Sequence, residues 1–463
     1  MMVKPSPMEG ACNARRRTAS LATDSIAMMA EQHDGKPANG SGLRWRPHYG
    51  CPAAGSTTIP LVFLLLLTGA LFLILGPTDS VLTLPSLRVV FSNPIHIAAA
   101  APPALPPAAA NVSDEDIGLP PPRQLTDPPY SLGRTILDYD ARRSAWLAAH
   151  PEFPARVPPA GRPRVLVVTG SAPARCPDPD GDHLLLRAFK NKADYCRVHG
   201  LEVYYNTAFL DAEMTGFWAK LPLLRSLMMA HPEVELLWWV DSDAVFTDMR
   251  FELPWERYAA HNLVLHGWEA KVYEEKSWVG VNTGSILIRN CQWSLDLLHA
   301  MAPMGPRGPV RDRYGELFAR ELSGRPSFEA DDQSALIYLL VTQRERWGDK
   351  VFFENSYELN GFWELIVDRY EELRRTGAWP LVTHFVGCKP CRRYADSYPA
   401  DRCRLGMERA FNFADDQILK LYGFGHESLN GTAVQRVRNE TGGPLDAEDE
   451  ELGRLLHPTF RAT

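Results

Sequence analysis

Short apolar runs and longer amphipathic segments alternate through the middle of this chain. Between residues 130 and 430 the apolar runs, rich in β-branched and aromatic residues, predict strands, and apolar positions three or four apart predict helices. The predicted strands are residues 164–171, 201–208, 235–240, 262–268, 279–290, 350–355 and 379–387. The predicted helices include residues 183–200, 218–232, 291–302 and 331–343. Near-continuous apolar strands separated by helices predict an α/β fold with a mostly parallel sheet, covered on both faces.

The regions on either side of this core have other patterns. Residues 1–58 lack periodicity and are interpreted as a disordered tail, and residues 431–463 as a polar C-terminal tail. Residues 59–75 are seventeen uncharged residues, at the short end for spanning a bilayer. Residues 76–129 hold twelve prolines, ten of them between Pro94 and Pro129 among alanine-rich runs, a composition that builds no core and predicts an extended stem.

The apolar run at residues 59–75 is interpreted as a single-pass signal-anchor. It is longer than the usual apolar core of a cleaved signal peptide and lies farther from the N-terminus. Five arginines precede it and Asp79 follows it, so the N-terminus is expected in the cytosol and everything after residue 76 in the lumen. Glycosylation sequons at Asn111, Asn430 and Asn439 agree with a lumenal location.

Six cysteines follow the predicted anchor, and in an oxidising lumen some of them should pair. The sequence does not choose among the fifteen complete pairings that six cysteines allow. They are Cys176, Cys196, Cys291, Cys388, Cys391 and Cys403. Cys388 and Cys391 form a C-x-x-C, which suggests half of a zinc site or a redox pair. Zinc is rejected because no second C-x-x-C exists and the lumen favours disulfides.

Composition and charge narrow the function classes. The 463 residues are 23% charged and 45% hydrophobic, an ordinary globular composition sufficient for one large domain or two. The net charge is −7 and the pI is about 6.0. The chain therefore lacks the excess of basic residues that would indicate nucleic acid as its main partner.

In the stretch LLWWVDSDAVFTDM, a predicted buried strand is followed directly by acidic residues. A turn after Val240 could bring Asp241 and Asp243 onto one cation, and their oxygen ligands suit Mg²⁺ or Mn²⁺. Such a metal could bridge a diphosphate and offset the charge that builds on a leaving nucleotide. The alternative is a solvated turn, because D-x-D is common by chance. Asp248 is expected to cap the segment that follows.

Other polar residues also end predicted strands. Ligands of such sheets lie beyond the carboxyl ends of the strands, so Gly170, Ser171, Asp241 and His384 are expected along one edge. His384 is either a hydrogen-bonded core residue or a nitrogen ligand that completes a Mn²⁺ site. Lys389 could meet a diphosphate as a point charge.

Two acid-rich tripeptides have similar shapes. Asp331-Asp332-Gln333 opens a helix, where the helix dipole by itself favours acids. The functional alternative places a carboxylate over a sugar, where it orients hydroxyls or stabilises an oxocarbenium-like centre. Asp415-Asp416-Gln417 lacks comparable context and is interpreted as a cap. The glycine of Asn282-Thr283-Gly284-Ser285 allows close approach of a ligand or marks a bulge.

Together these segments resemble the plant xyloglucan 6-xylosyltransferases, which share a family with galactomannan galactosyltransferases. The resemblance runs from about Pro129 to past Leu456 and leaves out the first 58 residues and the stem. It rests on motifs in a fixed order, among them WWVDSDAVFTDM, NTGSILIRNCQWSLDLL, FEADDQSALIYLL and VTHFVGCKPC.

The resemblance implies a GT-A glycosyltransferase fold and a type II Golgi membrane protein. It implies retaining transfer of xylose from UDP-xylose to O6 of glucosyl residues in the β-1,4-glucan backbone of xyloglucan. Retention without a clear nucleophile suggests same-face attack, with the leaving phosphate accepting the proton of the acceptor.

The resemblance also assigns site residues. The implied ligands of Mn²⁺ (or Mg²⁺) are Asp241, Asp243 and His384. The implied donor-binding residues are Gly170, Ser171, Ser242 and Lys389. The residues implied near the donor sugar and acceptor are Asp331, Asp332 and Gln333.

One departure from the family and three alternatives stay open. The family typically reads YxLHGYW where this chain reads YELNGFW, so Asn360 replaces a histidine and Phe362 a tyrosine. The alternatives are an α-1,6-galactosyltransferase that uses UDP-galactose on a mannan, and a weakly active scaffold subunit of a xyloglucan synthase complex. A phosphohydrolase is a weaker alternative, because no activated-nucleophile motif is present. A homo- or hetero-oligomer with related glycosyltransferases is also expected.

Overall fold

The computed structural model describes residues 119–154, 156–157, 161–389, 391 and 398–438. All of them belong to one of the two units into which the chain divides, and the other unit, residues 36–113, lies outside the described residues. The predicted cytosolic tail, the predicted anchor and most of the predicted stem therefore lie outside them as well. Within the described ranges no helix is long and apolar enough to cross a membrane.

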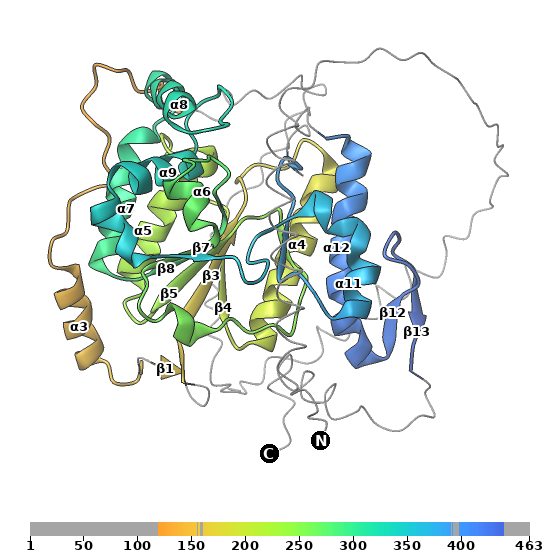
Figure 1. The fold of residues 1–463 in the computed structure, drawn as a ribbon. Helices are drawn as coiled ribbons and strands as arrows, with labels where there is room; N and C mark the ends of the chain where they lie inside the picture. The colour runs from red at the N-terminus through yellow and green to blue at the C-terminus, as the bar shows by residue number, and fades with distance from the viewer. Residues whose placement is uncertain (1–118, 155, 158–160, 390, 392–397, 439–463) are drawn as a thin grey trace, which may run out of the picture. The chain divides into compact units, whose positions relative to one another are not determined.

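A six-stranded sheet lies at the centre of the described part (Figure 1). In spatial order its strands are β4 (Glu202–Asn206), β3 (Val165–Gly170), β5 (Leu236–Val240), β8 (Val281–Arg289), β7 (Leu263–Gly267) and β9 (Val351–Glu354). Strand β3 is parallel to β4 and β5, and β7 is parallel to β9, whereas β8 is antiparallel to both of its neighbours. The predicted mostly parallel sheet is confirmed, with β8 as its one reversed strand.

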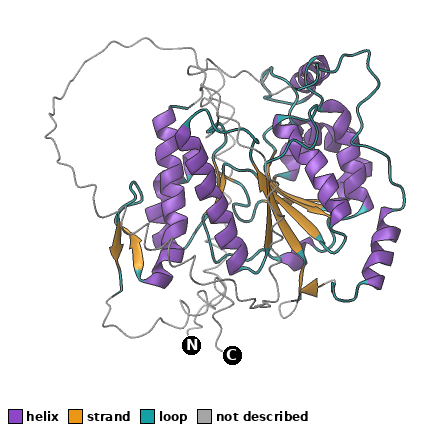
Figure 2. Cartoon of the chain, turned by 180° about the vertical axis from the view of Figure 1, so that it is seen from behind, coloured by secondary structure: helices purple, strands orange, loops and turns teal. Residues whose placement is uncertain are grey.

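Alternation along the strands divides the core between the two faces of this sheet. In β3, Leu166 and Val168 belong to one apolar cluster, and Val165 and Val167 to another. The first cluster also contains residues of α5 (Lys220–Ala230), α7 (Gln292–Met301), α8 (Pro309–Glu321) and α9 (Asp332–Thr342). The second contains residues of α4 (Pro179–Val198) and α12 (Ala400–Leu419). Figure 2 shows these helix layers on either side of the strands, as the sequence predicts.

The described residues also form further helices, 3-10 turns and hairpins. The helices are α3 (Tyr139–Ala149), α6 (Glu269–Tyr273), α10 (Arg344–Trp347) and α11 (Tyr370–Thr376). The 3-10 turns are η3 (Gly216–Ala219), η4 (Trp255–Tyr258), η5 (Ala302–Met304), η6 (Gly348–Lys350), η7 (Trp363–Leu365), η8 (Val367–Arg369) and η9 (Lys420–Tyr422). Two hairpins pair β1 (Arg156–Val157) with β2 (Arg162–Pro163), and β12 (Phe424–His426) with β13 (Val434–Arg436).

A separate small sheet corrects one prediction. Its strands are β10 (Gly361–Phe362), β11 (Val382–His384) and β6 (Ala244–Phe246). The strand predicted at residues 379–387 thus exists as β11, but it does not extend the central sheet. Its partners are β10, which is parallel, and β6, which is antiparallel. A buried apolar strand has the same sequence pattern in either sheet, so the pattern could not distinguish them.

The second acidic tripeptide lies inside α12, so its interpretation as a cap is wrong. Asp416 accepts hydrogen bonds from the backbone N–H of His426 (2.7 Å) and from Arg374 (2.9 Å). Gln417 accepts from the backbone N–H of Met249 at 3.0 Å. These side chains join a buried helix to neighbouring segments, a role that local sequence cannot show.

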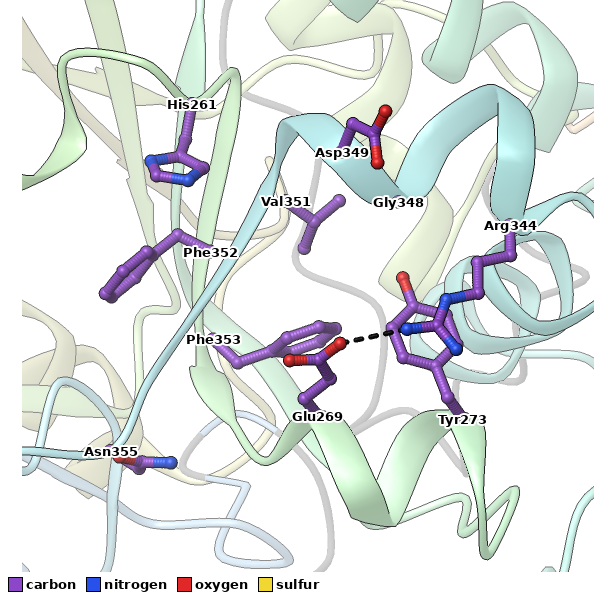
Figure 3. Close-up of a pocket in the computed structure, with 10 residues that line it drawn as sticks. All are labelled: His261, Glu269, Tyr273, Arg344, Gly348, Asp349, Val351, Phe352, Phe353 and Asn355. Carbon is purple, nitrogen blue, oxygen red and sulfur yellow. Dashed lines mark hydrogen bonds and ion pairs between the residues drawn. The ribbon is translucent and has the colours of Figure 1, made fainter.

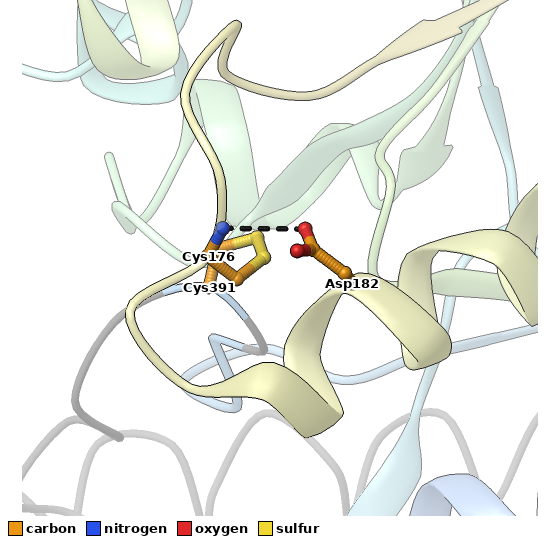
Figure 4. Close-up of side chains that lie close together, drawn as sticks. All are labelled: Cys176, Asp182 and Cys391. Carbon is orange, nitrogen blue, oxygen red and sulfur yellow. Dashed lines mark hydrogen bonds between the residues drawn. A yellow bond between two sulfur atoms is a disulfide. The ribbon is translucent and has the colours of Figure 1, made fainter. Parts of the chain in front are cut away.

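Two disulfides connect four of the six cysteines. Cys176 pairs with Cys391, Cys388 pairs with Cys403, and Cys196 and Cys291 are free. The expectation that some cysteines pair is confirmed. The two cysteines of the C-x-x-C have different partners. At the first disulfide the backbone N–H of Cys176 donates to Asp182 at 3.2 Å (Figure 4).

Candidate active site

The D-x-D turn joins the two sheets. Strand β5 ends at Val240, Asp241 to Asp243 form the turn, and β6 begins at the next residue. The backbone N–H of Asp241 donates to the carbonyl of Gly284 at 2.7 Å, and that of Ala244 donates to the carbonyl of Asp241 at 3.1 Å. In the small sheet Ala244 pairs with His384. Backbone hydrogen bonds therefore fix both ends of the turn, and strand pairing in the second sheet places His384 beside it.

Asp241, Asp243 and His384 converge. The Nε2 atom of His384 lies 3.3 Å from Asp243 Oδ1 and 3.6 Å from Asp241 Oδ2. One ligand atom from each of the three lies within 4.8 Å of the others. Burial of His384 disfavours the imidazolium, but the two facing carboxylates outweigh it and hold the pKa of His384 above its ordinary value. Two carboxylate oxygens and one imidazole nitrogen at this spacing fit a divalent cation such as Mn²⁺.

Gly284 makes this convergence sterically feasible. A Cβ at this position would lie 2.2 Å from His384 Cε1 and 3.1 Å from Asp241 Oδ2. The pairing of β7 with β8 also shifts register here: Leu265 pairs with Ile286, and His266 with Asn282. The predicted bulge is confirmed, and the groups that approach the glycine closely are the triad's own side chains.

Replacing Gly284 by alanine is expected to displace His384, since two non-bonded carbons cannot approach to 2.2 Å. Losing the placement of one ligand should lower divalent-metal affinity and transfer activity by about 10–100-fold. Calorimetric Mn²⁺ titration and initial rates measure both effects. The matched control is Gly431→Ala, because nothing lies within 4 Å of a Cβ there. Wild-type metal affinity in Gly284→Ala would contradict this account of the site.

A buried lysine that motif reasoning missed connects the turn to α9. Lys220 Nζ lies 2.8 Å from Asp332 Oδ2 and 3.7 Å from Asp241 Oδ1, and donates to the carbonyl of Thr283 at 3.2 Å. Burial disfavours its ammonium, but the facing carboxylates of Asp241 and Asp332 keep its pKa above the ordinary value. Lys220 is therefore charged and holds two of the candidate site's carboxylates together.

Two further side chains support the D-x-D turn. The indole of Trp239 donates to Asp241 Oδ1 at 2.5 Å. Lys192 of α4 is fully buried and donates to the carbonyl of Ala244 at 2.7 Å. Burial lowers the pKa of Lys192 to about 8. In the sequence Lys192 is an ordinary lysine of an amphipathic helix, and only the packing of α4 onto β6 shows its position.

The three members of the first acidic tripeptide have different surroundings. Asp331 is the N-cap of α9: it accepts from the backbone N–H of Ser334 at 2.8 Å and pairs with Arg325 at 2.9 Å. Asp332 faces Lys220, as described above. Gln333 donates to the carbonyl of Trp278 at 2.8 Å. The structure thus brings Asp332 to the D-x-D turn, and gives Asp331 bonds that fix the start of the helix.

The predicted donor-binding residues lie in several places. Gly170 ends β3 with its Cα so close to β4 that a Cβ would lie 2.3 Å from the carbonyl oxygen of Asn206. The backbone N–H of Ser171 donates to that same oxygen at 3.0 Å. Ser242 is half-buried in the D-x-D turn. The half-buried Lys389 lies with its Nζ 5.2 Å from the ring centroid of Phe217.

A cavity of about 360 Å³ lies along β9, and none of its lining residues belongs to the triad. Figure 3 shows Phe353 and Tyr273 on its walls, with Glu269 bonded to Arg344 at 3.0 Å. Arg344 also lies 4.0 Å from the ring centroid of Tyr273. Glu269 and Arg344 of this cavity thus already have partners in the protein.

Comparison with known proteins places the chain in a family. The model of the galactosyl transferase GMA12/MNN10 family matches residues 161–395. The chain belongs to this family. The matched segment contains Asp241, Asp243 and His384, together with Lys220 and the acidic tripeptide of α9. The resemblance inferred from the motifs is thereby confirmed at the level of the family and not of a specific member, and the protein is a glycosyltransferase by family.

Relatives of the chain cover most of its length. Probable glycosyltransferase 5 of Oryza sativa subsp. indica is 79% identical over 446 residues, which are 94% of this chain and 99% of that protein. Xyloglucan 6-xylosyltransferase 1 of Arabidopsis thaliana is 59% identical over 347 residues, which are 73% of this chain and 75% of that protein.

Solved structures are similar at a lower level. A glycosyltransferase involved in the glycosylation of the major capsid of PBCV-1 shares 14% identity with a TM-score of 0.32, covering 53% of this chain and 99% of that one. The galactosyltransferase LgtC, solved with donor and acceptor sugar analogs, shares 13% identity with this chain. Its TM-score is 0.26, and the match covers 52% of this chain and 95% of that one.

Proposed function

We propose that the chain is a retaining α-1,6-xylosyltransferase, which moves xylose from UDP-xylose to O6 of glucosyl residues in a β-1,4-glucan. The supporting observation is the convergence of Asp241, Asp243 and His384 in a chain 59% identical to a xyloglucan 6-xylosyltransferase. A GT-A fold, a Golgi membrane location with a lumenal catalytic domain, and oligomers with related glycosyltransferases belong to the same proposal.

The described residues have complementary roles in such a transfer. Asp241, Asp243 and His384 would hold Mn²⁺ or Mg²⁺, which would neutralise charge on the diphosphate. Lys220 fixes Asp332 and Asp241, so the carboxylates keep their places before any substrate binds. Lys389 would contact the diphosphate, and Gln333 would contact the sugars. No residue is assigned as a nucleophile, in keeping with same-face attack.

The test compares two donors on one acceptor. Purified full-length chain with Mn²⁺ and cello-oligosaccharide is expected to transfer from UDP-xylose and to use UDP-galactose about 10–200-fold less efficiently, because galactose carries an additional CH₂OH at C5. Initial rates and linkage analysis of the product measure this. Faster transfer from UDP-galactose would support the galactosyltransferase alternative, and no transfer from either donor would support a scaffold.

A further inference from the structure

Two buried glutamates lie four residues apart at the end of β9, and their surroundings differ. Glu354 accepts hydrogen bonds from Tyr258 at 2.6 Å and from Arg257 at 2.9 Å. Glu358 is only 9% exposed, yet no described residue donates a hydrogen bond to its carboxyl. Its Oε2 atom lies 3.8 Å from His266 Nε2. Burial without a donor raises the pKa of Glu358 to about 7.

Two residues close to Glu358, His266 in space and Asn360 in sequence, have unsatisfied polar atoms. Within the described part of the chain, Nδ1 of His266 and both amide atoms of Asn360 are buried and have no hydrogen-bond partner. Leaving a buried polar group unpaired destabilises the folded state, so folded proteins rarely keep several together without a reason. A ligand that supplies donors and acceptors at this place is such a reason.

This cluster of Glu358, His266 and Asn360 adjoins the metal-binding triad. His266 pairs with Asn282, two residues before the Gly284 that contacts the triad. The carbonyl of Glu358 accepts from the backbone N–H of Val382, two residues before His384.

Strand order indicates which substrate would reach the cluster. The turn predicted to hold the nucleotide follows β3, the D-x-D follows β5, and His266 lies on β7 beyond β8. A nucleotide-sugar laid along this edge runs from nucleotide to diphosphate to sugar, in the order β3, β5, β8. The next position, at β7 and the segment after β9, lies on the sugar side of the diphosphate and away from the nucleotide.

We propose that Glu358 and His266 form an acceptor subsite, in which the carboxylate accepts and the imidazole exchanges hydrogen bonds with hydroxyls of a glucosyl residue of the acceptor chain. The inference rests on the proposed function and specifies how that site would bind its acceptor. The half-buried Trp268, whose ring centroid lies 5.0 Å from that of His266, adds an aromatic side chain next to the subsite.

The test replaces Glu358 by methionine and by glutamine in the full-length chain. Calorimetric titration with cellohexaose in the presence of UDP and Mn²⁺ is expected to show acceptor affinity about 10–100-fold weaker in Glu358→Met. Glu358→Gln, which keeps a carbonyl acceptor, should lose less than tenfold. UDP affinity, Mn²⁺ affinity and the slow hydrolysis of UDP-sugar without acceptor should stay unchanged in both variants.

Stability separates recognition from a structural role. Removing a buried carboxyl that has no donor should leave the melting temperature of Glu358→Met at pH 7.5 equal to or above that of the wild type. The matched control, Glu354→Gln, should melt lower because it weakens bonds to Arg257 and Tyr258, with acceptor affinity unchanged.

Three outcomes would overturn the inference. Wild-type cellohexaose affinity in Glu358→Met would show that the cluster binds only water. A raised KM for the UDP-sugar with unchanged acceptor affinity would assign the cluster to the donor. Cellohexaose that fails to bind the wild type with UDP and Mn²⁺ would exclude a glucan subsite. Failure of the proposed function looks different: the wild type would transfer faster from UDP-galactose than from UDP-xylose, or neither donor would support transfer.

Discussion

Replacing Asp243 by asparagine is expected to lower kcat/KM for sugar transfer by about 10²–10³-fold, the loss typical of removing a group that stabilises developing charge. The substitution keeps the shape of the side chain and removes one of two carboxylates that face His384. Because the candidate cation is held mainly by charge, Mn²⁺ affinity should fall with activity. Steady-state kinetics and calorimetric Mn²⁺ titration measure the two quantities on the same preparation.

The same segment offers a control for this substitution. Asp248 lies five residues later, accepts a hydrogen bond from the backbone N–H of Arg250 at 3.0 Å and is no member of the triad. Asp248→Asn should therefore keep metal affinity and kcat/KM close to the wild-type values. If Asp243→Asn retained more than half of the wild-type activity and bound Mn²⁺ normally, the metal-binding role of the D-x-D would be refuted.

Much of the central sheet could be predicted because its strands have a local signature. Residues 235–240 were predicted as a strand, and β5 is Leu236–Val240. The acids after it were likewise placed at the edge of a sheet. The direction of β8 could not be predicted, because a buried strand is continuously apolar whichever way it runs.

The candidate site was less predictable because its parts come from two sheets. Motif resemblance named His384, but its approach to Asp241 depends on the pairing of β11 with β6, which no local pattern encodes. Lys220 gave no sequence signal either. It lies at the start of an amphipathic helix, where lysines are usually solvated, and only the packing of α5 beside β8 and α9 places it against Asp332.

Gly284 shows why a site of this kind needs tertiary information. A glycine within a strand pattern indicates a bulge or a close approach, and the sequence could not say which group approaches. The structure identifies the imidazole of His384 and the carboxylate of Asp241 as those groups. The space that His384 and Asp241 occupy thus depends on the missing side chain of a glycine on a third strand, β8. This strand itself supplies none of the candidate metal ligands.

Replacing Lys220 by methionine is expected to destabilise the fold by about 3–5 kcal/mol, because it leaves Asp332 buried and unpaired. Denaturant unfolding measures this loss. Lys271→Met, which removes only a surface pair with Glu275, should change stability by less than about 0.5 kcal/mol.

A double substitution separates the structural role of Lys220 from its role in the candidate site. Lys220→Met combined with Asp332→Leu removes both charges, so most of the lost stability should return. The rate of sugar transfer should stay at least about 100-fold below the wild-type rate. Asp241 has lost the neighbouring ammonium of Lys220, and the carboxylate of Asp332 no longer faces the sugars. Recovery of activity together with stability would mean that the pair only supports the fold. Recovery of stability alone would show that the buried ion pair is kept for its effect on the transferred sugar.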